Sequence, residues 1–147
     1  MNCNFDKPQA IALINGGSTV PSISGIIKFY QRKNCVLVVA DISGLPRTDR
    51  GFFGFHIHEG ADCGGDNFSN SKGHYNHSGS THPSHAGDLP PLMLCGNDAH
   101  LSVLTDRFNV SDILGRTVII HSMPDDFTSQ PSGNAGEKIA CGKIKKP

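Results

Sequence analysis

The chain has 147 residues, with thirteen Lys and Arg balancing thirteen Asp and Glu. This length suits one domain with its own core, so we expect residues 1–147 to form a single domain. The balanced charge argues against broad binding to nucleic acid or to an acidic membrane surface. No apolar stretch approaches the ~20 residues of a transmembrane helix.

The first eight residues lack the charged start and apolar run of an intact secretory signal. We therefore expect a cytoplasmic protein as the chain stands. If a signal peptide has been removed, we expect an exported protein of the periplasm or cell envelope.

Short apolar segments separated by turns predict an all-β domain. Seventeen glycines are spread between runs rich in β-branched residues, as in sandwiches and barrels. Strands are predicted at 10–14, 22–32, 35–42, 51–58, 92–95, 99–106, 116–122 and 139–145. We expect an eight-stranded antiparallel Greek-key sandwich or barrel with two long functional loops. One helical turn is expected, at 110–114.

The two long polar segments are 59–91 and 123–138. The first consists mainly of Gly, Ser, Asn, Asp and His and shows almost no apolar periodicity. A stretch of about 30 residues without secondary structure inside a compact domain is either functional or disordered. Six of the eight histidines lie between residues 56 and 85, and this concentration favours function.

The spacing of these histidines differs from that of a disordered His-rich tract. His56 and His58 are two apart on a predicted strand, so both side chains lie on one face and can hold one ion. That pair alone is weak evidence, because ordinary strand histidines share its spacing. His82, His85 and Asp88 are three apart in a loop, and with one more His they would complete a tetrahedral zinc shell. The alternative is a polar turn with incidental histidines.

Two further histidines could complete the two sets, and imidazole suits copper as well as zinc. His74 lies between them in the segment GHYN, and His121 follows the apolar run TVII. A lone strand histidine is more often a satisfied core residue than a ligand. His121 is a candidate ligand only because the fold could place it beside the other candidate histidines.

Five motifs make the chain resemble the copper/zinc superoxide dismutases: GFHIHE (54–59), GHYN (73–76), HAGDLP (85–90), GRTVIIH (115–121) and GNAGEKIACG (133–142). They stand in the family's order, and GHY and HAGDLP are similar to bacterial members. The resemblance implies a β-sandwich fold. It also implies dismutation of superoxide anion to oxygen and hydrogen peroxide by copper redox cycling beside a structural zinc. The family includes monomers and dimers, so the resemblance allows a homodimer.

The resemblance also implies roles for single residues. The family's copper ligands are matched by His56, His58, His74 and His121. Its zinc ligands are matched by His74, His82, His85 and Asp88. His74 is similar to the bridging histidine, which leaves copper on reduction and carries a proton. Asp125 is similar to the carboxylate that orients ligands of both metals, although its spacing equally suits a solvated loop aspartate.

Five cysteines cannot all pair within the chain. The resemblance implies a disulfide between Cys63 and Cys141, which would tie the first long loop to the last strand. Cys3, Cys35 and Cys95 have no partner in the family. Because Cys35 and Cys95 lie in apolar runs, we expect them to be buried free thiols.

Three departures from the family pattern concern the copper channel. Lys138 stands where the family has an arginine that attracts the anionic substrate. Lysine keeps the charge but not the planar fork, and Glu137 offsets part of the field, so we expect an active channel with weaker anion guidance. The segments from His82 to His85 and from His121 to Lys138 are short, which predicts a more exposed copper.

The main alternative function is a non-enzymatic copper-binding or copper-delivery protein on the same fold. Such domains are expected to lack copper ligands, whereas this chain has all four candidates. A copper-only relative would lack the zinc ligands, and a purely structural zinc module would leave His56, His58 and His121 unexplained. His77 and His100 match no family ligand, and we expect both at the surface.

Overall fold

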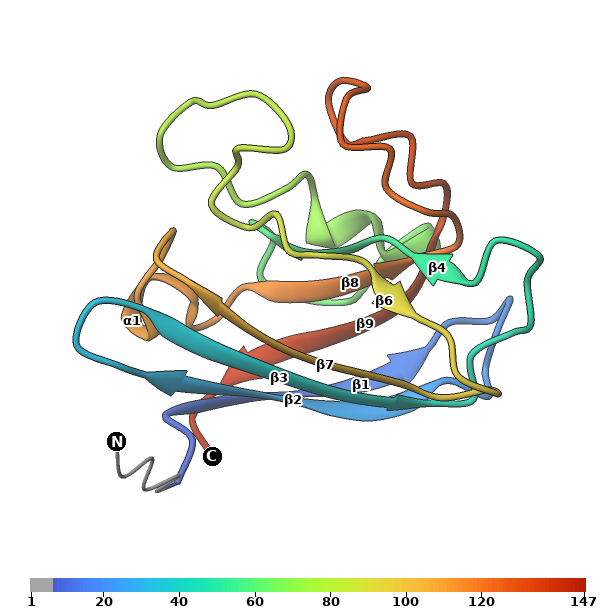
Figure 1. Ribbon diagram of the computed structural model, residues 1–147, viewed down its shortest axis with the longest axis horizontal. Coiled ribbons are helices and arrows are strands. Elements are labelled where there is room, and N and C mark those ends of the chain that lie inside the picture. The colour runs from blue at the N-terminus through green and yellow to red at the C-terminus, as the bar shows by residue number, and fades with distance from the viewer. Residues whose placement is uncertain (1–6) are drawn as a thin grey trace.

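The computed structural model describes residues 7–147 and shows two layers of antiparallel strands beneath two long loops (Figure 1). The strands are β1 (Ala10–Gly16), β2 (Ser24–Gln31), β3 (Val36–Ser43), β4 (Phe52–Phe53), β5 (Phe55–His58), β6 (Leu92–Met93), β7 (Ala99–Thr105), β8 (Thr117–His121) and β9 (Lys138–Lys145). Seven of them form one sheet in the order β5-β8-β9-β1-β2-β3-β7. β4 and β6 form a separate pair. The all-β antiparallel prediction is confirmed.

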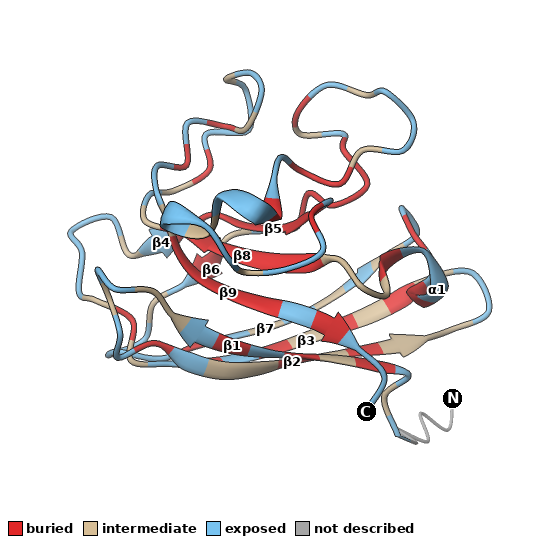
Figure 2. Ribbon diagram, turned by 180° about the vertical axis from the view of Figure 1, so that it is seen from behind, coloured by how far each residue is buried: buried red, intermediate tan, exposed pale blue. Residues whose placement is uncertain are grey.

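The core lies between the layers and follows the alternation of the sequence. In β3 the inward side chains are buried and alternate with more exposed ones, as the period of two requires. All five residues of β8 are buried, because the long loops cover the face of this strand that the core does not. Figure 2 shows this buried band along β8 and β9.

The predicted strand 51–58 is divided into β4 and β5 at Gly54, so residues 7–147 contain nine strands where the sequence predicted eight. Gly54 donates its N–H to Met123 O and accepts from His121 N, both at 2.8 Å. A Cβ at Gly54 would lie 2.7 Å from Ala135 Cβ, so only glycine allows the second loop to approach this closely. The division therefore brings that loop onto the His56–His58 strand.

Two short helices lie outside the sheet. The predicted turn near residue 110 is the helix α1 (Val110–Ile113), begun by a capping box of Asn109 and Asp112. The 3₁₀ helix η1 (Asp66–Ser71) lies in the first long loop, where the sequence predicted no secondary structure. This helix is kinked, with non-helical backbone angles at Asn67 and Phe68, and its sequence has no apolar periodicity from which it could be predicted. Within residues 7–147, no helix is long and apolar enough to cross a membrane.

The predicted disulfide between Cys63 and Cys141 is present and joins the first loop to β9. Cys35 is partly buried beside the β2–β3 turn, whereas Cys95 is exposed. The expectation of a buried thiol at Cys95 is wrong, because β6 ends at Met93 and Cys95 lies in a turn closed by backbone hydrogen bonds to Asp98. Cys3 lies outside the described residues.

Candidate metal centre

Six histidines and two aspartates form a buried cluster where the two loops meet β5 and β8. Each is at most 8% exposed. The candidate donor atoms form three groups within which all atoms lie within 4.8 Å of one another: two groups of four residues, and a smaller one of His56, His82 and Asp125. The first group is His56, His58, His74 and His121. The second group is His74, His82, His85 and Asp88. His77 and His100 are exposed, as expected.

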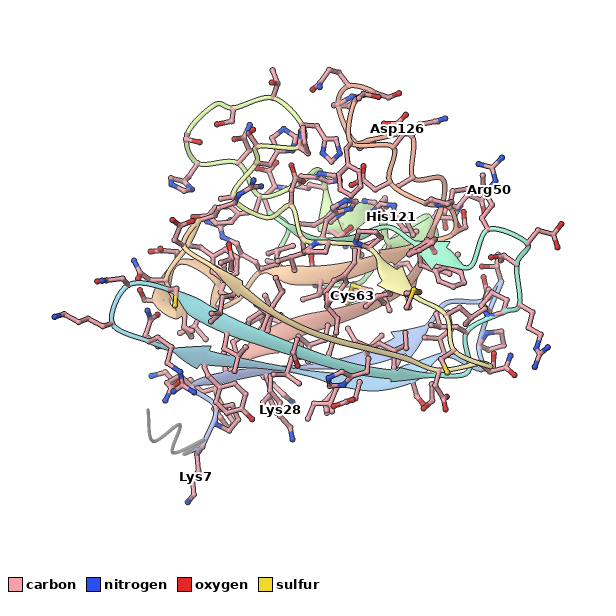
Figure 3. All side chains as sticks on the ribbon, in the orientation of Figure 1. Lys7, Lys28, Arg50, Cys63, His121 and Asp126 are labelled. Atoms are coloured by element: carbon pink, nitrogen blue, oxygen red, sulfur yellow. A yellow bond between two sulfur atoms is a disulfide. The ribbon has the colours of Figure 1, made fainter. Side chains whose placement is uncertain are left out.

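Strand pairing and loop contacts bring these residues together. β5 carries His56 and His58 and pairs with β8, which ends at His121. The first loop runs along the other edge of β5, where His56 bridges to Asp88 and His58 bridges to His74. Neighbouring backbone segments from three parts of the chain thus supply one cluster. Figure 3 shows His121 beneath the loops, between the two layers and the loop tips.

His74 faces both groups. Its Nδ1 lies 2.7 Å from Asp88 Oδ1 and 3.3 Å from His85 Nδ1, on the side of the second group. Its Nε2 is buried without a hydrogen-bond partner. The His74 ring also stacks on His56, with centroids 3.9 Å apart. One imidazole therefore offers a different nitrogen to each group.

In the first group, hydrogen bonds fix which nitrogen of each ring is free. His58 Nδ1 donates to the Lys72 carbonyl at 2.8 Å, and His121 Nδ1 donates to the Gly136 carbonyl at 3.3 Å. Because a carbonyl oxygen only accepts, Nε2 of each ring is left for another partner. The two Nε2 atoms lie 3.2 Å apart. His56 Nε2 contacts Asp125 Oδ2 at 2.7 Å, which leaves His56 Nδ1 buried and unpartnered.

The second group gathers three Nδ1 atoms around one carboxylate. His82 Nδ1 and His85 Nδ1 lie 3.1 Å and 3.2 Å from Asp88 Oδ2. His82 Nε2 contacts Asp125 Oδ1 at 2.8 Å, so that Nδ1 is the free nitrogen of this ring. Three imidazole nitrogens and one carboxylate are a typical tetrahedral zinc shell.

Burial keeps His56, His58 and His121 neutral at ordinary pH. It lowers the pKa of His56 to about 4 and that of His121 to about 3, and it lowers the pKa of His58 well below the usual value. Burial acts to raise the pKa of Asp125, but hydrogen bonds from His56 and His82 outweigh it and hold the pKa well below its ordinary range. Neutral imidazole is the form that binds a metal.

The donor set fits one copper and one zinc. Within the described chain, three buried ring nitrogens have no hydrogen-bond partner: His56 Nδ1, His74 Nε2 and His82 Nδ1. Unsatisfied buried polar atoms are rare in native proteins and call for a missing partner such as an ion. Four imidazoles suit copper, and three imidazoles with a carboxylate suit zinc.

A pocket of about 380 Å³ opens onto the first group. It reaches His58, His74 and His121, and Lys138 lies on its wall. Lys138 Nζ donates to Ser71 Oγ and to the Lys72 carbonyl, each at 2.8 Å. The same carbonyl accepts from His58, so Lys138 is tied to the backbone that orients a candidate ligand.

Comparison with known proteins agrees with this geometry. The model of the copper/zinc superoxide dismutase family matches residues 23–144. The chain belongs to this family.

Three curated relatives carry the name superoxide dismutase (Cu-Zn). The protein of Legionella pneumophila is 36% identical over 133 residues, covering 85% of this chain and 80% of the relative. That of Schizosaccharomyces pombe is 35% identical over 158 residues, covering 92% and 96%. One of Aquifex aeolicus is 32% identical over 143 residues, covering 87% and 82%. The resemblance seen in the sequence is confirmed.

Two residues that support the centre, Gln130 and Arg107, were not predicted from the sequence. Gln130 accepts from His82 N at 2.9 Å and donates to His82 O at 2.7 Å. Arg107 donates to Pro83 O at 2.7 Å and to His85 O at 3.2 Å. Their hydrogen bonds to the first loop all go to backbone atoms, so no side-chain motif could have identified them.

Proposed function

We propose that this chain is a superoxide dismutase, which converts two superoxide anions and two protons into one oxygen and one hydrogen peroxide. The proposed copper ligands are His56, His58, His74 and His121. The proposed zinc ligands are His74, His82, His85 and Asp88. The observation that carries the proposal is His74, whose two nitrogens face two separate sets of donors.

When bound, copper supplies one-electron redox chemistry and zinc supplies a fixed positive charge beyond His74. His74 is the proposed catalytic residue at the bridge, because a proton can be held at its Nε2 while Nδ1 stays beside Asp88. Lys138 is the second, since it lines the pocket and its Nζ donates to the Lys72 carbonyl that also accepts from His58. Asp125 orients His56 and His82 from behind.

The proposal is tested by following superoxide decay directly, with protein reconstituted in copper and zinc. We expect fast decay in the wild type and its loss in His121→Ala. The matched control is His100→Ala, which removes an exposed histidine outside the cluster and should leave decay unchanged. No decay despite stoichiometric bound copper would overturn the proposal and favour a copper-binding or copper-delivery role.

We further propose that residues 1–147 act as one domain on a small anion, without nucleic acid or membrane partners. The balanced charge supports this. A homodimer is tested by the mass of the metal-loaded protein in solution. The Cys63–Cys141 disulfide supports the exported location over the cytoplasmic one, because disulfides persist in oxidising compartments.

A further inference from the structure

Lys72 has a backbone conformation that lysine rarely adopts. Its φ is 59° and its ψ is −149°, at the border of a region that is essentially restricted to glycine. It ends η1 and directly precedes Gly73 and the proposed bridging ligand His74. Strain of this kind persists only where the surrounding structure over-determines it, and it concentrates at functional sites.

The backbone contacts of Lys72 explain its conformation, but they do not explain why this position is a lysine. Its N–H donates to Ser69 O at 3.1 Å. Its carbonyl accepts from His58 Nδ1 and from Lys138 Nζ, both at 2.8 Å. Glycine would make the same three contacts without the steric cost of a Cβ. The reason for lysine must therefore lie in its side chain.

Lys72 belongs to the wall of the pocket that opens onto the first group. Lys72 is exposed and lines the pocket that reaches His58 and His121. Among the described residues that line this pocket, Lys72 and Lys138 carry a formal charge and no carboxylate is present. Because the chain has no net charge, any field that attracts an anion to the pocket must be local.

We propose that Lys72 supplies the outer positive charge that draws a small anion into the pocket, ahead of Lys138, and that the strained backbone is retained for this charge. The inference rests on the proposed function in naming superoxide as the anion. Its physical content applies to any small monoanion that enters the same pocket.

The charge is tested with azide, a monoanion whose binding to copper(II) is followed by absorption without turnover. Lys72→Gln keeps the backbone and removes the charge, and it should slow azide association to copper- and zinc-loaded protein about threefold at low ionic strength. The difference should disappear at about 1 M salt, where the screening length is ~3 Å. Lys28→Gln is the matched control, because Lys28 lies in β2 on the far side of the molecule from His121 (Figure 3).

The strain is tested by thermal unfolding of the metal-free protein. Lys72→Gly should raise the melting temperature by about 3 °C, because it relieves the left-handed strain. Lys72→Gln should leave it unchanged. If Lys72→Gln and Lys28→Gln show the same azide rates and salt dependence, or if Lys72→Gly is not stabilised, the inference is overturned.

Superoxide decay, measured in parallel, separates the two proposals. Wild-type protein that fails to consume superoxide, while azide association still depends on Lys72, would overturn the proposed function and support the role of Lys72. Wild-type protein that consumes superoxide, but whose azide association rate is the same in Lys72→Gln, would support the proposed function and overturn the role of Lys72.

Discussion

Asp125 Oδ2 lies 2.7 Å from His56 Nε2, and this contact decides which nitrogen of His56 is available to a metal. The carboxylate only accepts, so Nε2 carries the proton and Nδ1 is free. The other oxygen of Asp125 contacts His82 Nε2 at 2.8 Å. One carboxylate therefore sets the tautomer of a ring in each metal group.

Asp125→Asn should weaken the binding of both metals. An asparagine side chain presents one donor and one acceptor, so one of the two rings would face an N–H and lose its orientation. We expect copper and zinc affinities to fall by about 10- to 100-fold, measured by competition with a chelator.

The matched control for this change is Asp41→Asn. Asp41 also contacts a histidine, His100, at 2.6 Å, but on the surface and away from both groups. Asp41→Asn should leave both affinities unchanged. Equal affinities in Asp125→Asn and the wild type would show that the rings are oriented without Asp125.

The parts of the centre that local geometry determines were predictable from the sequence. His56 and His58 share a strand face because of the two-residue period, and His82 and Asp88 lie in one loop. Assigning His74 to both groups required the family resemblance, since spacing alone does not bring the loop to β5. The division of the strand at Gly54 and the exposure of Cys95 depend on tertiary contacts that no local pattern records.

Gln130→Ala should loosen the first loop at His82. The Gln130 amide makes two hydrogen bonds to the backbone of this proposed zinc ligand and so joins the second loop to the first. Losing both should accelerate zinc release by about tenfold, followed with a chromogenic chelator. In Gln130→Glu the carboxylate can still accept from His82 N but opposes His82 O, so release should also be faster. Unchanged release in both variants would contradict the coupling.

The disulfide should contribute a large part of the stability of the metal-free protein. Cys63 and Cys141 are 78 residues apart in sequence, so their bond strongly restricts the unfolded chain. Replacing both with serine should lower the free energy of unfolding by about 4 kcal/mol on the loop-entropy model, measured by denaturant titration of chelator-treated protein. Cys95→Ser removes an exposed thiol outside the bond and serves as the control. Equal midpoints for all three proteins would contradict the prediction.

The stability of the metal-free protein should fall as the pH falls from 6.5 to 4. Burial lowers the pKa of His56 to about 4 and that of His121 to about 3, whereas the unfolded chain keeps values near 6.5. In this window the unfolded state binds protons that the native state rejects, so the free energy of unfolding decreases with decreasing pH and is level above the window. His56 alone accounts for a loss of about 3 kcal/mol at pH 4.

Denaturant titration of chelator-treated protein at several pH values measures this dependence. His121→Gln should retain the loss due to His56 and show a shallower slope, because one titrating ring has been removed. A stability that stays level from pH 7 to pH 4 would mean that the rings take up protons in the folded protein as readily as in the unfolded chain. Such a result would contradict the burial of His56 and His121 in the folded metal-free protein, on which the proposed metal sites depend.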